Sequence, residues 1–193
     1  MTVWTAFRWE TIAITAAWAA SEVALTILTR SKSGALVKAD RASIAAIWVT
    51  TAVSIFLGVR FGERPAGFIA AGSLAISGTG LVLMLAGLAV RWAAILTLGR
   101  FFTADVSIQR EHRIVETGFY RGVRHPSYAG GLLTFIGLGL TFSNIWSALV
   151  LTVLPLGAFL YRISVEERAL VAYFGDDYVR YKRRTKRLIP WVY

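Results

Sequence analysis

The polar segment 111–128 contains both histidines of the chain, His112 and His125, and its last five residues are Arg-His-Pro-Ser-Tyr. Pro126 suits the first turn of a helix, because proline lacks an N–H group and its φ angle is already near the helical value. The start of a helix offers unpaired backbone N–H groups and the positive end of the helix dipole. We therefore predict a helix that begins at Pro126 and whose first turn can bind an anion.

Two arginines add positive charge just before this helix start, Arg121 and Arg124. His125 precedes the proline and is therefore pushed towards extended backbone geometry. These features favour an anion site, but a loop lying among lipid headgroups would use the same residue types. The residues alone leave both interpretations open.

A second pair of candidate residues lies nearer the C-terminus. Arg162 directly follows an uncharged run and is expected at the membrane boundary. Glu166 is four positions later, on the same face of a helix, and a surface salt bridge is the simpler interpretation of such a pair. The tail 176–193 holds six Lys and Arg residues against two Asp. We predict that it anchors the protein to anionic lipids and has no catalytic role.

The composition predicts an integral membrane protein and excludes several kinds of site. Of 193 residues, 56% are hydrophobic, and the mean hydropathy is +0.58, which a soluble domain of this size could hardly bury. The formal net charge is +10. The basic residues lie between and after the apolar runs, as they do in cytoplasmic loops of membrane proteins, so no nucleic-acid partner is expected. The chain has no cysteine, and two histidines without an HExxH pattern make a poor metal site, so none is predicted.

The apolar runs predict an all-α polytopic membrane protein with about five transmembrane helices. The first three spans are expected at 11–29, 42–59 and 66–90. Residues 91–100, which begin and end with arginine, are predicted to form a helix that leaves the membrane or lies on its surface. The uncharged run 126–161 is too long for one span and short for two, so two short or tilted helices turning at Ser143 and Asn144 are expected.

The distribution of basic residues predicts on which side of the membrane each span ends. The basic loop 30–41, the central segment and the basic tail are all predicted to be cytoplasmic, with the N-terminus outside. Glu22 lies inside the first apolar run. A carboxylate there is costly against lipid, so it should face another helix or lie near an interface. A functional role and a position close enough to the helix end to reach water are both left open.

Two sequence motifs resemble those of the isoprenylcysteine carboxyl methyltransferase family. The first runs through His112-Arg-Ile-Val115, Gly118-Phe-Tyr120 and Arg124-His-Pro-Ser-Tyr128, and the second joins Glu166-Glu167 to Phe174-Gly175-Asp-Asp-Tyr178-Val-Arg-Tyr181. Members of this family are membrane enzymes that use S-adenosylmethionine, and related phospholipid methyltransferases share the motif pair. The resemblance covers about residues 98–190. It implies a methyltransferase core in 98–193, with a helical hairpin and a cytosolic C-terminal helix, following the three spans that hydropathy predicts in 1–97.

The resemblance also implies roles for individual residues. Arg162 would face the substrate as the catalytic residue, and the cofactor site would lie on the cytoplasmic side, with S-adenosylhomocysteine as the product. The acceptor would be a prenylated cysteine or another lipophilic molecule. The residues that would bind the cofactor are His112, Arg113, Ile114, Val115, Tyr120, His125, Pro126, Ser127, Tyr128 and Glu166.

These residue types suit methyl transfer, in which positioning and desolvation supply most of the acceleration. A carboxylate acceptor is already a nucleophile at pH 7 and needs no general base. Arg162 would hold it with two parallel hydrogen bonds, the sulfonium would lie against the ring of Tyr120 or Tyr128, and Glu166 would accept from a ribose hydroxyl or the ammonium group.

Three other functions remain open at this point. N-methylation of a phospholipid amine would require a base to remove a proton from the acceptor. A membrane reductase using NADPH could be built on a similar helical scaffold. A non-enzymatic membrane scaffold with a lipid-binding tail belongs to a different class altogether.

Overall fold

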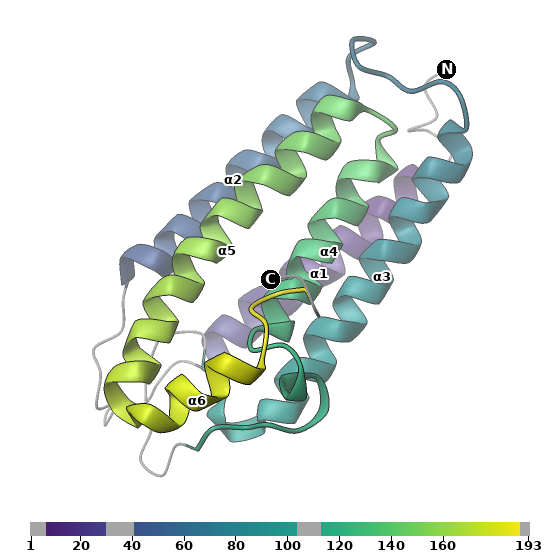
Figure 1. Ribbon diagram of the computed structural model, residues 1–193. Coiled ribbons are helices and arrows are strands. Elements are labelled where there is room, and N and C mark those ends of the chain that lie inside the picture. The colour runs from purple at the N-terminus through teal and green to yellow at the C-terminus, as the bar shows by residue number, and fades with distance from the viewer. Residues whose placement is uncertain (1–6, 30–40, 104–112, 190–193) are drawn as a thin grey trace.

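The computed structural model describes residues 7–29, 41–103 and 113–189. Figure 1 shows long helices lying side by side, with a short helix, α6, across one end of the bundle. In chain order the elements are α1 (Arg8–Leu28), α2 (Arg41–Gly62), α3 (Ser73–Leu98), the short 3₁₀ helices η2 (Gly99–Phe101) and η3 (Gly118–Arg121), α4 (Pro126–Thr141), α5 (Ile145–Phe174) and α6 (Asp176–Arg184).

Among the described residues, four helices are long and apolar enough to cross a bilayer: α1, α2, α3 and α5. The helix α4 occupies the place of the fifth predicted span and packs against α3 and α5. Its 16 residues rise about 24 Å, less than the roughly 30 Å of a hydrocarbon core. The protein is thus an all-α, multi-pass membrane protein, as the hydropathy predicts.

The hairpin between α4 and α5 turns where the sequence predicts, at Ser143 and Asn144. The side-chain oxygen of Asn144 caps α5 by accepting from the backbone N–H of Trp146 at 2.9 Å. Its Nδ2 donates to the carbonyl oxygens of Phe61 and Ala66 at 3.1 and 3.0 Å. One side chain therefore ties this turn to the connection between α2 and α3.

The second helix of the hairpin is longer than predicted. The sequence suggests two short helices within 126–161, which is right for α4 but wrong for α5, whose 30 residues run on to Phe174. The helix ends at Gly175, whose φ of +56° favours glycine. The uncharged run stops at Arg162, but α5 continues because Arg162, Glu166 and Glu167 have partners inside the protein, as described below.

The predicted limits of the third span are also wrong, at both ends. The helix α3 begins at Ser73 rather than residue 66, and it passes through Arg91 without a break to Leu98. A separate surface helix over 91–100 is therefore not formed. Arg91 remains inside the helix because its Nη2 donates to Glu22 Oε2 of α1 at 2.6 Å, so Glu22 does face another helix.

The closest packing in the bundle joins α3 to α4 through paired glycines. A Cβ atom added at Gly130 would lie 2.6 Å from the carbonyl oxygen of Gly87 and 2.6 Å from the nitrogen of Arg91. About two turns further along α4, a Cβ atom added at Gly137 would lie 2.6 Å from the carbonyl oxygen of Gly80. Glycine at these positions lets the two backbones touch, which is a common device in membrane helix pairs.

We expect Gly130→Ala to force α3 and α4 apart and to lower the free energy of unfolding by about 1–3 kcal/mol. Gly157→Ala in α5 is the matched control, since a Cβ there meets nothing within 4 Å and alanine favours the helix. Thermal unfolding of both variants in detergent measures the difference. Equal midpoints would contradict the close packing of α3 on α4.

The helix ends are arranged so that the charged segments gather together. Figure 1 shows α1, α3 and α5 ending, and α2 and α4 beginning, at the end of the bundle where α6 lies. This is the arrangement that the charge pattern predicts for the loop after α1, the central segment and the tail. Their assignment to the cytoplasm remains a prediction from charge.

Candidate active site

The first predicted motif forms a loop that leads into α4. Pro126 is the first residue of α4, as predicted, and the first backbone bond of that helix runs from the N–H of Ala129 to the carbonyl oxygen of His125 at 3.1 Å. The N–H groups of Ser127 and Tyr128 precede this bond and so have no acceptor within the helix. His125 is buried at the end of the loop.

A cavity of about 200 Å³ lies between this loop, the C-terminal half of α5 and the ends of α1, α2 and α3. Nine residues proposed from the sequence line it: Arg113, Ile114, Val115, Tyr120, His125, Ser127, Tyr128, Arg162 and Glu166. Pro126 is buried at the start of α4 but is not among the lining residues. His112 lies outside the described residues. The two motifs, far apart in the chain, thus meet around one space.

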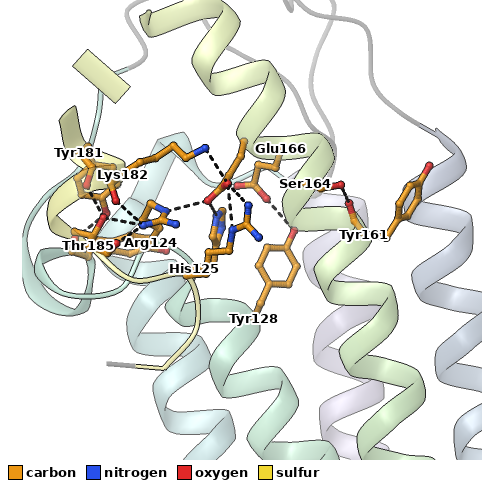
Figure 2. Close-up of polar contacts among 12 residues, drawn as sticks. Arg124, His125, Tyr128, Tyr161, Ser164, Glu166, Tyr181, Lys182 and Thr185 are labelled. Atoms are coloured by element: carbon orange, nitrogen blue, oxygen red, sulfur yellow. Dashed lines mark hydrogen bonds and ion pairs between the residues drawn. The ribbon is translucent and has the colours of Figure 1, made fainter. Parts of the chain in front are cut away.

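Arg162 and Glu166 are connected through a tyrosine. The Tyr128 hydroxyl donates to Glu166 Oε2 at 3.0 Å and accepts from Arg162 Nε at 3.4 Å; Figure 2 shows Tyr128 pointing from α4 towards Glu166. Arg162 is only 2% exposed, and its Nη1 also donates to Ser43 Oγ of α2. The interpretation of Arg162 and Glu166 as a surface salt bridge is therefore wrong.

Glu167 is the centre of a second cluster, which the sequence did not single out as a site residue. Its carboxylate is 3% exposed and accepts from Arg124 Nε at 2.9 Å and Arg187 Nη2 at 3.0 Å. Lys182 Nζ lies 3.3 Å away and His125 Nε2 3.4 Å away. A buried carboxylate among several cations joins the loop before α4, helix α5 and the C-terminal region.

The segment 185–188, which we call the C-terminal strap, pairs with the loop before α4 through its backbone. The N–H of Arg124 donates to the carbonyl oxygen of Lys186 at 2.7 Å, and the N–H of His125 to that of Arg187 at 3.0 Å. The Arg124 guanidinium also donates to Thr185 in the strap (Figure 2). The strap therefore fixes the backbone of the Arg-His-Pro-Ser-Tyr cluster from outside.

These contacts change the interpretation of the basic tail. Lys182 and Arg187 face Glu167, Arg184 pairs with Glu116, and Arg180 pairs with Asp177. Much of the tail's charge is thus used within the protein. That the tail has no catalytic role stays a prediction. Binding of anionic lipid by this region stays a prediction.

Three tyrosines complete the wall on the side of α6. The Tyr181 hydroxyl donates to the carbonyl oxygen of Tyr120 at 2.7 Å, and the Tyr120 hydroxyl donates to that of Ala94 in α3 at 3.3 Å. Burial raises the pKa of Tyr120, Tyr178 and Tyr181 well above the ordinary value. Their hydroxyl groups therefore stay protonated at physiological pH, and those of Tyr120 and Tyr181 remain donors.

Residues 80–172 match the sequence profile of the isoprenylcysteine carboxyl methyltransferase family. This part of the chain is similar to the family. Over 119 residues the chain is 39% identical to protein-S-isoprenylcysteine O-methyltransferase B of Arabidopsis thaliana, an alignment that covers 61% of this chain and 60% of the relative. The mouse protein-S-isoprenylcysteine O-methyltransferase is 32% identical over 119 residues, 61% of this chain and 42% of that protein.

A solved structure of the family has a similar arrangement of helices. The structure of a eukaryotic intramembrane Ras methyltransferase, isoprenylcysteine carboxyl methyltransferase, matches with a TM-score of 0.62 at 25% identity, over 79% of this chain and 54% of that one. The chain thus spans about 60% of the Arabidopsis relative and about half of the solved structure. The isoprenylcysteine carboxyl methyltransferase profile begins within α3 and ends within α5, so the cavity walls from α1, α2 and α6 lie outside it.

Proposed function

We propose that the protein transfers a methyl group from S-adenosylmethionine to the carboxylate of a prenylated cysteine, or of a similar lipophilic acceptor, at the cytoplasmic boundary of the membrane. The observation that carries this proposal is the lining of the cavity. Charged and hydroxyl-bearing side chains from the two motifs form one part of it, and apolar side chains of α1 and α2 form another. A polar methyl donor and a lipophilic acceptor would together require a cavity with both polar and apolar walls.

The polar part of the cavity suits the methyl donor. Glu166 offers a carboxylate to an ammonium or ribose hydroxyl group, and the first turn of α4, at Ser127 and Tyr128, offers backbone N–H groups to a carboxylate. The apolar side chains of Ile114 and Val115 would contact the adenine ring. Bound in this way, S-adenosylmethionine supplies an electrophilic methyl group on a sulfonium, which the ring face of Tyr128 can stabilise.

The apolar part of the cavity suits a lipid tail. Leu25 of α1 and Ile44, Ile47 and Trp48 of α2 line it. The helix α1 packs on α3 and α4, while α2 packs on α5, so the two helices border the cavity from separate sides of the bundle. An acceptor tail between them would reach the site from within the bilayer.

The chain's own residues supply orientation and charge. Arg162 would hold the acceptor carboxylate, since a guanidinium matches a carboxylate with two parallel hydrogen bonds. Ser43 and Tyr128 fix the orientation of that guanidinium. In the transfer, a carboxylate oxygen forms a bond to the methyl carbon as the carbon–sulfur bond breaks, and the electron pair of that bond remains on sulfur. No proton moves, so the site needs no general base.

The test is transfer of radiolabelled methyl from S-adenosylmethionine to N-acetyl-S-farnesylcysteine by the purified protein in lipid vesicles. We expect label in the acceptor that mild alkali releases, because methyl esters are base-labile. Alkali-stable label in a phospholipid would instead establish N-methylation of an amine. Stabilisation against heat by NADPH but not by S-adenosylhomocysteine would indicate a reductase, and stabilisation by neither would indicate a scaffold.

A further inference from the structure

An ion pair between α1 and α3 borders the cavity. Arg91 donates through Nε and Nη2 to the two carboxylate oxygens of Glu22, and Trp18 Nε1 donates to Glu22 Oε1 at 3.0 Å. The side chains of Arg91 and Glu22 are 14% and 21% exposed, and both line the cavity. Charged side chains are costly inside a membrane span, and those that occur there tend to have a function.

The remaining nitrogen of Arg91 reaches the first turn of α4. Its Nη1 donates to Ser127 Oγ at 2.9 Å and to the carbonyl oxygen of Ser127 at 3.2 Å. The backbone of α3 at Arg91 touches α4 at Gly130, about one turn after Ser127, so the side chain runs along α4 towards its start. A pair that served only to join α1 to α3 would not require this contact with the motif residue Ser127.

We propose that Glu22 is a positioning residue for the methyl-donor site and acts through Arg91 on Ser127. Two hydrogen bonds from one guanidinium to the Glu22 carboxylate fix its plane, and the fixed plane directs Nη1 at Ser127. The first turn of α4, with its free N–H groups, is thereby held against α3. This inference rests on the proposed function for its ligand, but the positioning itself can be measured without one.

The inference can be separated from a purely structural role by a double-mutant cycle. Glu22 and Ser127 share Arg91 as their common partner, so their effects on binding of S-adenosylhomocysteine should not add. By calorimetry on detergent-purified protein, we expect Glu22→Gln and Ser127→Ala each to raise Kd about tenfold, the value of one hydrogen bond to a charged group. The double variant should be little weaker than either single variant. Additive effects, or an unchanged Kd in Glu22→Gln, would overturn the inference.

The control is Glu10→Gln, which removes an exposed carboxylate from the first turn of the same helix and should leave Kd unchanged. Should Glu22→Gln fold poorly, Arg91→Lys provides a second test: lysine keeps the charge beside Glu22 but lacks the fork that reaches Ser127. We expect this variant to keep its melting temperature and to show the same rise in Kd. A fall in melting temperature with an unchanged Kd would mean that the pair only joins the helices.

Hydrogen exchange gives a readout that needs no ligand. The amide of Ala129, which makes the first backbone hydrogen bond of α4, should exchange several-fold faster in Glu22→Gln than in Glu10→Gln, because local opening of the helix start becomes easier. Equal exchange rates would overturn the positioning role. If the wild type binds no S-adenosylhomocysteine, the proposed function fails, and the exchange rates still decide whether Glu22 positions α4.

Discussion

Replacing Glu167 with alanine is expected to lower the free energy of unfolding by about 3 kcal/mol, because the substitution leaves the buried Arg124 guanidinium without its carboxylate. Arg124, His125 and Arg187 all contact Glu167, and Arg124 is 8% exposed. With the carboxylate gone, the contacts between the C-terminal strap and the loop before α4 should open. Thermal unfolding in detergent measures the stability, and limited proteolysis near the C-terminus measures the opening.

The adjacent carboxylate provides the matched control. Glu166 lines the cavity and accepts a hydrogen bond from Tyr128. We expect Glu166→Ala to abolish binding of S-adenosylhomocysteine in calorimetry while the melting temperature stays close to that of the wild type. Unchanged binding in Glu166→Ala would refute its role towards the donor. An equal loss of stability in both variants would mean that Glu167 is no more structural than its neighbour.

The second large effect is expected at Arg162. Arg162→Ala should reduce methyl transfer about 10²- to 10³-fold, the loss of two hydrogen bonds to a charged group, while the Kd for S-adenosylhomocysteine changes little. Lysine at this position should recover only part of the activity, since it cannot form two parallel hydrogen bonds with a carboxylate. Turnover with a farnesylcysteine acceptor measures the first effect, and calorimetry the second.

Arg168 is the control for this prediction, because it is an exposed arginine six residues further along α5. Arg168→Ala should keep both turnover and donor binding. Full activity of Arg162→Ala on a carboxylate acceptor would contradict the proposed contact. If Arg162→Ala also lost binding of S-adenosylhomocysteine, Arg162 would be assigned to binding of the methyl donor and not of the acceptor.

Local signals in the sequence were sufficient for much of the fold. Proline at the start of α4 and the turn at Ser143 and Asn144 each depend on their own neighbours in the chain, so the sequence predicts them correctly. The residues proposed from the sequence also include nine that line the cavity. What they did not predict is the other half of the cavity, to which Leu25, Ile47 and Trp48 contribute from α1 and α2.

The sequence alone did not predict which charged side chains pair with residues far away in the chain. A hydropathy pattern does not show whether a charged side chain has a partner, so Arg91 was predicted to end the third span. In the folded chain Arg91 pairs with Glu22, which lies 69 positions earlier in the sequence. Glu167 stands beside Glu166 in the same motif, and only the folded chain separates a carboxylate facing the cavity from one facing Arg124 and Arg187. Lys182 and Arg187 looked like a lipid anchor for the same reason.

The length of α5 has a consequence for how the protein can respond to its membrane. Thirty residues make a rod of about 45 Å, and Arg162 lies about 26 Å along it, near the edge of a roughly 30 Å core, with Glu166 one turn beyond. A thicker or thinner bilayer can change how deeply this rod is immersed, but it cannot change the spacing between the two side chains. Changes in bilayer thickness should therefore leave the alignment of Arg162 with Glu166 unchanged.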